Sequence, residues 1–235
     1  MNPPVPPSVA ANLSLPKKPP RFRTRQPFAL LPARLHPEKK VYLCGRIPRI
    51  PPSTMNRAVF LDRDGVLIEE KNYLHRIEDV VFITGGPPAL RRLQDAGFHL
   101  FIVSNQSGVG RGFFTMAEVE KVNEHIAGQL ARQGVTFRKI YIAPEAPDQP
   151  SRGRKPSAQF LFDARDEFGV DLAQSYMIGD KLIDLECGWN AGVKQTILVR
   201  TGYGVEQERE AAGTLGPAVI VDGLSAAAEW ILRQQ

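Results

Sequence analysis

Short runs of β-branched and aromatic residues alternate with amphipathic segments along residues 55–235, and this alternation limits the folds open to the chain. Runs such as "AVFLD" and "FHLFIVSN" are typical of strands, whereas "MAEVEKVNEHIAGQLARQ" places apolar residues at helical spacing. Strands that alternate with helices form βαβ units around a parallel sheet. The sequence therefore predicts an α/β fold.

The boundaries of the expected elements follow from these patterns. Thr115 and Glu118 have the spacing of a capping box at the start of the 116–133 helix. Two further helices, 86–97 and 157–169, end at glycines and fit as crossovers between strands. The expected strands are 58–62, 98–105, 139–144, 175–180, 194–200 and 218–223.

Residues 1–54 differ from the rest in composition, and we predict them to be a disordered or extended extension of a 55–235 domain. They contain 13 of the 20 prolines, which rules out regular helix and sheet. They also hold 10 of the 30 Lys and Arg residues and one of the 25 Asp and Glu residues. A transit peptide, a nucleic-acid-binding arm and a start codon assigned upstream of Met55 remain alternatives.

Charge and cysteine content narrow the function classes. Outside this extension, 20 basic residues face 24 acidic ones, so the basicity belongs to residues 1–54 and no nucleic-acid partner is expected for the domain. Cys44 and Cys187 form no disulfide framework, which favours the cytoplasm. No run approaches the roughly 18 apolar residues of a membrane span, so no membrane partner is expected.

Polar side chains follow three of the predicted strands, at the edge where parallel sheets bind ligands. Asp62 and Asp64 end the first strand and Asp180 ends the fourth. Strand alternation predicts that the two acids share a side and that Arg63 points away, while Gly65 allows a sharp turn. A plain polar turn or an ion pair with Arg or Lys are the alternatives. Three carboxylates at one edge favour a Mg²⁺ site.

Two other segments carry groups suited to phosphate oxygens. The stretch "SNQSGVGRGFF" offers hydroxyl, amide and backbone donors together with Arg111. Arg154 and Lys155 in "GRKPSAQ" precede a predicted helix start, where the helix dipole favours an anion. Each segment alone is common in loops, but together with the acidic strand ends they indicate a phosphate site.

These segments resemble the motifs of the haloacid dehalogenase-like phosphohydrolase superfamily over residues 55 to about 221. The motifs are "VFLDRDGV", "VSNQSG", the lysine of "RKP" and "IGDKLIDLECG". With "NQSGVGRGFFT" and "RKPS", the chain is most similar to the subgroup of heptose bisphosphate and histidinol phosphate phosphatases. The resemblance implies a Rossmann-like three-layer sandwich with a mostly parallel sheet and no large cap domain.

The resemblance also implies residue roles. Asp62 would be the nucleophile that forms an aspartyl-phosphate, and Asp64 the general acid and base. Mg²⁺ would be held by Asp62, the backbone carbonyl of Asp64, and Asp180. Ser104 and Lys155 would hold the phosphoryl group. Asp184 lies four residues after Asp180 and would face the same side if a helix begins there, so we assign it a supporting role. The positions implied in substrate binding are Glu70, Lys71, Asn72, Tyr73, Asn105, Ser107, Arg154 and Lys181, with Arg111 for a second anionic group.

One departure from the subgroup concerns zinc. Many members carry C-x-H and then C-x-C before R-K-P, whereas this chain reads "APEAPDQPSRGRKP". Ala143, Glu145, Ser151 and Gly153 occupy the ligand positions, and none supplies a thiolate or imidazole. We therefore expect no zinc site.

We predict a Mg²⁺-dependent phosphomonoesterase that acts, as a monomer, on a small phosphorylated metabolite. A heptose 1,7-bisphosphate that loses its 7-phosphate is the preferred substrate, and histidinol phosphate is the main alternative. The competing classes are a non-catalytic phosphate-binding protein and a nucleic-acid-binding protein that acts through residues 1–54.

Overall fold

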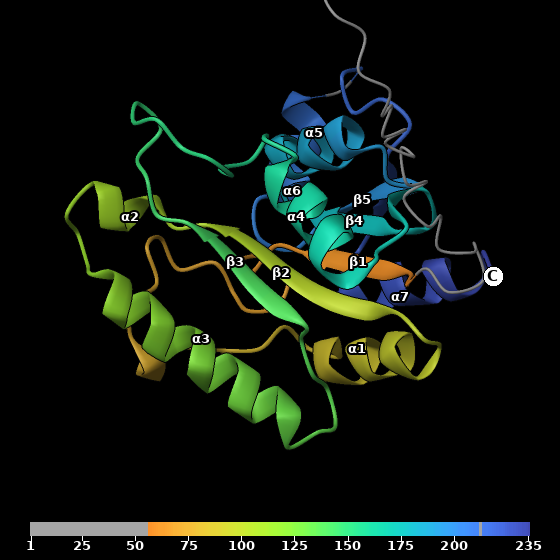
Figure 1. Ribbon diagram of the computed structural model, residues 1–235, viewed down its shortest axis with the longest axis horizontal. Helices are drawn as coiled ribbons and strands as arrows, with labels where there is room; N and C mark the ends of the chain where they lie inside the picture. The colour runs from red at the N-terminus through yellow and green to blue at the C-terminus, as the bar shows by residue number, and fades with distance from the viewer. Residues whose placement is uncertain (1–55, 212) are drawn as a thin grey trace, which may run out of the picture. The chain divides into compact units, whose positions relative to one another are not determined.

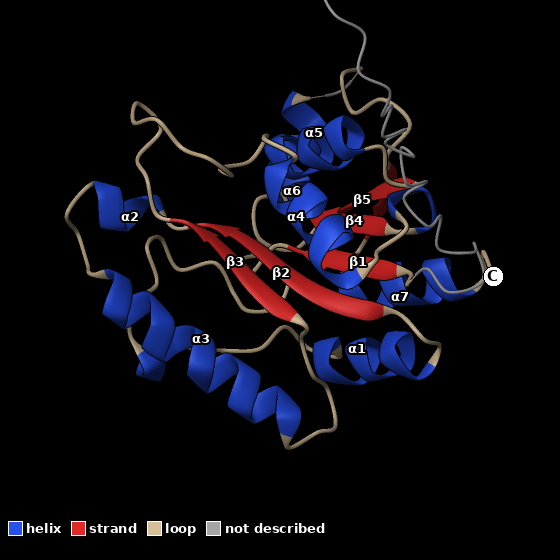
Figure 2. Cartoon of the chain, viewed as in Figure 1, coloured by secondary structure: helices blue, strands red, loops and turns tan. Residues whose placement is uncertain are grey.

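The computed structural model describes residues 56–211 and 213–235, and the predictions for residues 1–54 lie outside this part of the chain. The described part contains a six-stranded sheet in the order β3-β2-β1-β4-β5-β6, with every neighbouring pair parallel (Figures 1 and 2). The strands are β1 (Ala58–Leu61), β2 (His99–Asn105), β3 (Lys139–Ala143), β4 (Tyr176–Gly179), β5 (Gln195–Val199) and β6 (Val219–Val221).

The strand order alone predicts where a ligand can bind. From β1 the chain builds the sheet outward through β2 and β3, and it then returns to add β4 on the other side of β1. Neighbouring crossover connections therefore run in opposite directions at the β1 and β4 carboxyl ends, which opens a crevice there. Residues that follow these two strands can face a ligand.

Helices cover both faces of the sheet, which confirms the three-layer sandwich. On one face lie α1 (Gly86–Asp95), α3 (Met116–Ala131) and α7 (Leu224–Leu232), and on the other lie α4 (Gln159–Phe168) and α5 (Leu182–Ala191) (Figure 1). Alternation along β1 explains the two cores, because Val59 and Leu61 join the first and Ala58 and Phe60 the second. Strands buried on both faces need apolar residues at every position.

Each predicted strand and helix begins and ends within two residues of its bounds in the structure. The capping box is confirmed: the Glu118 N–H donates to Thr115 Oγ1 at 3.3 Å, and the Thr115 N–H donates to Glu118 Oε2 at 2.7 Å. Three helices were not predicted, α2 (Ser107–Gly110), α6 (Gly204–Glu210) and α7 (Leu224–Leu232), and no bounds were predicted for α5 (Leu182–Ala191). Two of the four residues of α2 are glycines, which are more typical of loops.

The connection from β1 to α1 is short, in line with the expectation that there is no large cap domain. Within residues 62–85 the structure has one turn of 3-10 helix, η2 (Ile77–Asp79), and the isolated bridges Asp64 to Ile68 and Ile68 to Phe82. In the part of the chain that the structure describes, no helix has the length and apolar character needed to cross a membrane.

Candidate active site

The turn after β1 places the first acidic residues. Gly65 has φ +83°, a conformation that L side chains rarely adopt. A Cβ at this position would also overlap the carboxylate of Asp180, so the glycine permits both the turn and the approach of the two segments. The sharp turn predicted at Gly65 is therefore present.

Three buried carboxylates meet beside this turn. Ligand atoms of Asp62, Asp180 and Asp184 all lie within 4.8 Å of one another. Asp180 Oδ2 accepts a hydrogen bond from the Tyr203 N–H at 2.9 Å, while its buried Oδ1 has no hydrogen-bond partner among the described residues. Burial, and then the charges of Asp62 and Asp184, raise the pKa of Asp180 to about 8. This set of oxygens fits a hard divalent cation, which would offset the repulsion.

Metal-dependent stability should follow from the pKa of Asp180. The pKa of Asp180 is about 8 in the folded protein and 3.8 ordinarily. In metal-free protein, the contribution of this group to folding stability is therefore fully present below pH 3.8, and it is lost as the pH rises through about 8. Mg²⁺ competes with that proton. We expect Mg²⁺ to raise the melting temperature more at about pH 8.5 than at about pH 6, each measured against EDTA. Equal shifts at the two pH values, or a shift that survives in Asp180→Asn, would contradict a site at this cluster.

Lys155 provides the internal counter-charge for the cluster. Its Nζ lies 2.8 Å from Asp62 Oδ1 and 2.7 Å from Asp184 Oδ1, with the lysine side chain 1% exposed. Burial alone would lower the pKa of Lys155, but the charges of Asp184 and Asp62 and hydrogen bonds to them raise it above its ordinary value. Asn105 at the end of β2 fixes the lysine backbone, since its Oδ1 accepts from the Lys155 N–H at 3.0 Å and its Nδ2 donates to the Lys155 carbonyl at 3.2 Å.

The prediction that Arg63 points away from the acids is wrong. Its buried guanidinium donates from Nε to Asp64 Oδ2 at 2.9 Å and from Nη2 to Asp64 Oδ1 at 3.0 Å. Nη1 donates to Asn123 Oδ1 of α3 at 3.1 Å, and this bond holds the guanidinium group in place. The reason is that β1 ends at Leu61, so strand alternation no longer sets the side-chain directions beyond it.

Ser104 reaches the acids through a neighbour that the sequence analysis missed. Gln106 Nε2 donates to Ser104 Oγ at 2.8 Å and to Asp64 Oδ2 at 3.0 Å. Asp64 therefore accepts hydrogen bonds from both Arg63 and Gln106 in this conformation.

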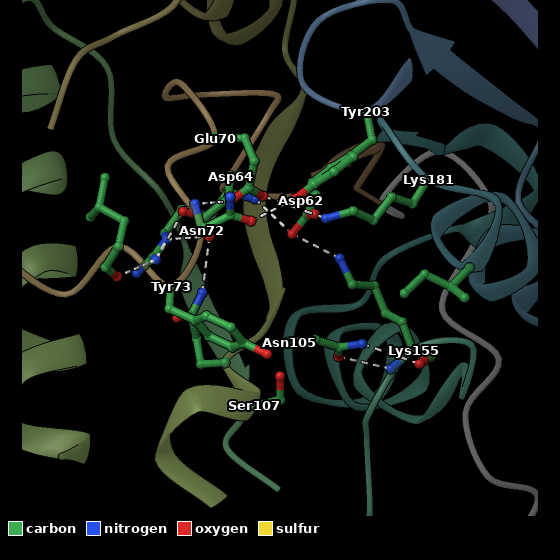
Figure 3. A pocket seen from close by; sticks show the side chains of 14 residues that line it. Asp62, Asp64, Glu70, Asn72, Tyr73, Asn105, Ser107, Lys155, Lys181 and Tyr203 are labelled. Atoms are coloured by element: carbon green, nitrogen blue, oxygen red, sulfur yellow. Dashed lines mark hydrogen bonds and ion pairs between the residues drawn. The ribbon is translucent and has the colours of Figure 1, made fainter. Parts of the chain in front are cut away.

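These groups open into a cavity of about 240 Å³ (Figure 3). Of the predicted site residues, it is lined by Asp62, Asp64, Glu70, Asn72, Tyr73, Asn105, Ser107, Lys155 and Lys181. Ser104, Asp180 and Asp184 are buried behind the lining, Arg154 is half-buried, and Lys71 and Arg111 are exposed outside it. The lining residues that the sequence analysis did not assign to the site are Arg63, Leu74, Gln106, Ile183 and Tyr203.

Hydrogen bonds close the loop that precedes Lys155. Ser151 Oγ donates to Glu145 Oε2 at 2.7 Å and accepts from the Arg154 N–H at 3.1 Å, while Arg154 Nη1 donates to the Glu145 carbonyl at 3.0 Å. We call these three bonds the loop clasp. Glu145 and Ser151 stand at two of the four positions that the sequence analysis compared with zinc ligands, so in this chain side chains join the two ends of the loop directly.

Comparison with known proteins places this fold and site in a class. Residues 153–227 match the family described as HAD-hydrolase-like. The D-glycero-β-D-manno-heptose-1,7-bisphosphate 7-phosphatase of Haemophilus ducreyi is 41% identical over 173 residues, covering 71% of this chain and 95% of the relative. That of Escherichia coli K12 is 41% identical over 162 residues, covering 66% and 85%. The chain therefore belongs to the haloacid dehalogenase-like (HAD) hydrolases, in the group of the heptose bisphosphate phosphatases.

A solved structure agrees with this placement. The D,D-heptose 1,7-bisphosphate phosphatase from B. bronchiseptica, complexed with magnesium and phosphate, superposes with a TM-score of 0.71 at 30% identity. The alignment covers 76% of this chain and 99% of that one. The similarity therefore extends over nearly the whole of that relative.

Proposed function

We propose that the protein is a Mg²⁺-dependent phosphomonoesterase that removes the 7-phosphate from a heptose 1,7-bisphosphate. The observation that carries the proposal is the convergence of Asp62, Asp180 and Lys155 beside one polar cavity at the carboxyl ends of β1 and β4. A nucleophilic carboxylate, a set of cation ligands and a buried ammonium are the parts that phosphoryl transfer requires. The names and titles of the relatives support the substrate and the metal.

Asp62 would carry the first step. One of its carboxylate oxygens attacks phosphorus, a P–O bond to the carboxylate forms, and the P–O bond to the sugar breaks. Lys155, 2.8 Å from Asp62 Oδ1, restrains the nucleophile and faces the charge of the phosphoryl oxygens. Mg²⁺ held by Asp62, the carbonyl of Asp64, and Asp180 would supply Lewis-acid neutralisation of those oxygens.

Asp64 would move the proton. In protonated form it donates to the departing alkoxide, and it then accepts the proton of the water that hydrolyses the aspartyl-phosphate. The bonds from Arg63 and Gln106 now occupy both of its oxygens. Asp64 must leave these donors to reach the sugar oxygen, so Arg63 stabilises its resting position.

Two arginines beside the cavity support a bisphosphate as the substrate. Burial, and then the positive charge of nearby Arg111, lower the pKa of Arg154. Two cations within range of each other repel, and a second phosphate on the substrate would offset that repulsion. Ser107, whose carbonyl accepts from the Arg111 N–H at 3.0 Å, lines the cavity and links Arg111 to it. Histidinol phosphate has no second phosphate to place there.

A phosphate-release assay on purified protein tests the proposal. We expect kcat/KM for a heptose 1,7-bisphosphate to exceed that for histidinol phosphate by about tenfold or more, because a hydrogen bond to a charged group contributes about 1.5–3 kcal/mol. Release should require Mg²⁺ and stop with EDTA. Faster hydrolysis of histidinol phosphate would overturn the substrate, and release that is indifferent to EDTA would overturn the metal role.

The setting of the enzyme follows from the same chemistry. We propose a cytoplasmic monomer in which residues 55–235 act without the 1–54 extension. Phosphorylated sugars do not cross membranes unaided, which supports the cytoplasm as the location. The expectation that it binds no nucleic acid rests on the 20 basic and 24 acidic residues of the 55–235 segment.

A further inference from the structure

Tyr203 joins the catalytic cluster to the opposite wall of the cavity. It follows β5 and directly precedes α6, and its N–H donates to Asp180 Oδ2 at 2.9 Å. Its hydroxyl donates to Asn72 Oδ1 at 2.9 Å, although the two residues lie 131 positions apart in sequence. Lys181 Nζ lies 4.2 Å from the centre of its ring. Figure 3 shows Lys181 and Tyr203 on one side of the site and Asn72 and Tyr73 on the other.

The segment that receives this hydroxyl is conformationally strained. Asn72 has φ +41° and Tyr73 has φ +64°, and two successive non-glycine residues in the left-handed region need support from their surroundings. The Asn72 N–H donates to Glu70 Oε1 at 2.8 Å, and the Tyr73 ring packs edge-on against Phe113 with centroids 4.9 Å apart. On the side of the carboxylate cluster, the Tyr203 hydroxyl supports Asn72, and Lys181 Nζ lies 3.4 Å from Glu70 Oε2.

A second, larger hollow lies beyond this contact. It has a volume of about 820 Å³ and shares Glu70, Asn72 and Tyr203 with the catalytic cavity. The hydrogen bond between Tyr203 and Asn72, which we call the Tyr203–Asn72 bridge, therefore spans residues that line both spaces. Without the bridge, the 70–73 segment would keep the ion pair between Lys181 Nζ and Glu70 Oε2 at 3.4 Å but would lose its hydrogen bond at Asn72.

We propose that Tyr203 is a positioning residue that determines substrate specificity: through the bridge it fixes Glu70–Tyr73 over the sugar and closes the catalytic cavity toward the adjoining hollow. The inference deepens the proposed function, on which it rests. It assigns the 70–73 contacts to the leaving group rather than to the transferred phosphoryl group, which lies against Asp62 and Lys155. Burial, and then the negative charge of Glu70, raise the pKa of Tyr203, so its hydroxyl stays protonated at neutral pH.

Tyr203→Phe isolates this role. It removes the hydroxyl but keeps the N–H that binds Asp180 and the ring beneath Lys181. We expect KM for the heptose bisphosphate to rise about threefold to tenfold, the worth of one hydrogen bond, with the loss falling on KM rather than kcat. KM for p-nitrophenyl phosphate, which has no sugar hydroxyls, should stay the same.

Two further variants separate positioning from a general effect on the fold. In an Asn72→Ala background, Tyr203→Phe should have no additional effect, because both changes remove the same bond. Tyr141→Phe is the matched control, since Tyr141 is buried away from the cavity lining and its hydroxyl has no partner among the described residues. This control should leave both KM values unchanged.

Three results would overturn the inference: an unchanged KM for the bisphosphate, an equal rise for both substrates, or additive effects of Tyr203→Phe and Asn72→Ala. Failure of the proposed function has a different signature. If the proposed function is wrong, the wild-type protein will not hydrolyse the heptose bisphosphate. The KM effect of removing the Tyr203–Asn72 bridge is then measured with the non-aromatic phosphomonoester that the wild-type protein hydrolyses best.

Discussion

Asp62→Asn is expected to reduce phosphate release by at least about 10⁴-fold, the scale seen when a catalytic nucleophile is removed from other enzymes. The amide has nearly the same shape, and the backbone bond from the Asp62 N–H to the Ile178 carbonyl at 3.0 Å does not depend on the side chain. An amide cannot form the acyl phosphate, however, and it offers a weaker partner to Lys155, now 2.8 Å from Asp62 Oδ1. Steady-state phosphate release measures the loss.

A trapping experiment makes this prediction more specific. Acid quenching during turnover of ³²P-labelled substrate should leave label on the wild-type chain and none on Asp62→Asn. Asp95→Asn is a matched control, because Asp95 is an exposed carboxylate at the end of α1 that pairs with Arg91 on the surface. Its activity should be unchanged. If phosphate release survives in Asp62→Asn, the nucleophile assignment is wrong.

Lys155→Met should strongly reduce activity and also destabilise the fold. Lys155 is the buried cation between Asp62 and Asp184, so its loss leaves two carboxylates without their counter-charge. Breaking a buried ion pair by removing one partner costs about 3–5 kcal/mol. Activity should fall by about 10²-fold to 10³-fold or more, because electrostatic support of the phosphoryl oxygens is lost. Urea unfolding in EDTA and phosphate release measure the two effects.

A double variant separates the two roles of Lys155. Adding Asp184→Asn removes one unpaired charge and should recover part of the stability while leaving activity low. Lys139→Met is the matched control: Lys139 pairs with Glu167 on the exposed surface, with side chains 40% and 49% exposed, and such pairs contribute at most about 1 kcal/mol. Unchanged unfolding of Lys155→Met would show that Lys155 does not neutralise the cluster.

The strand ends were predictable because sheet geometry is a local rule. Asp62 and Asp180 each follow a buried apolar strand, and parallel strands bring such positions to one edge. The sequence analysis could therefore place both acids near one ligand. The role of Lys155 came from motif resemblance instead, and that of Asp184 from its helical spacing of four residues from Asp180. The distance of 2.7 Å between Lys155 Nζ and Asp184 Oδ1 also depends on the conformation of the loop that carries Lys155, which the sequence pattern does not predict.

The remaining site residues depend on contacts between distant segments. The direction of Arg63 follows from its bonds to Asp64 and Asn123, and the bond to Asn123 exists only after α3 has packed. Tyr203 lies in "TGYG", a turn-like stretch, and its contact with Asn72 has no signal in the sequence. Gln106 could have been predicted from the sequence, since it directly follows the polar end of β2. Lys71 and Arg111, in contrast, were predicted from the motifs but lie outside the cavity lining.

The loop clasp holds the segment before Lys155 through bonds that contain no sulfur. Bonds among Glu145, Ser151 and Arg154 involve no thiolate that an oxidant could attack. Cys187, the cysteine among the described residues, is buried, and burial raises the pKa of its thiol to about 12, which keeps it unreactive. An enzyme built in this way should keep its substrate preference under oxidative stress and zinc starvation, with Mg²⁺ supply as its main inorganic requirement.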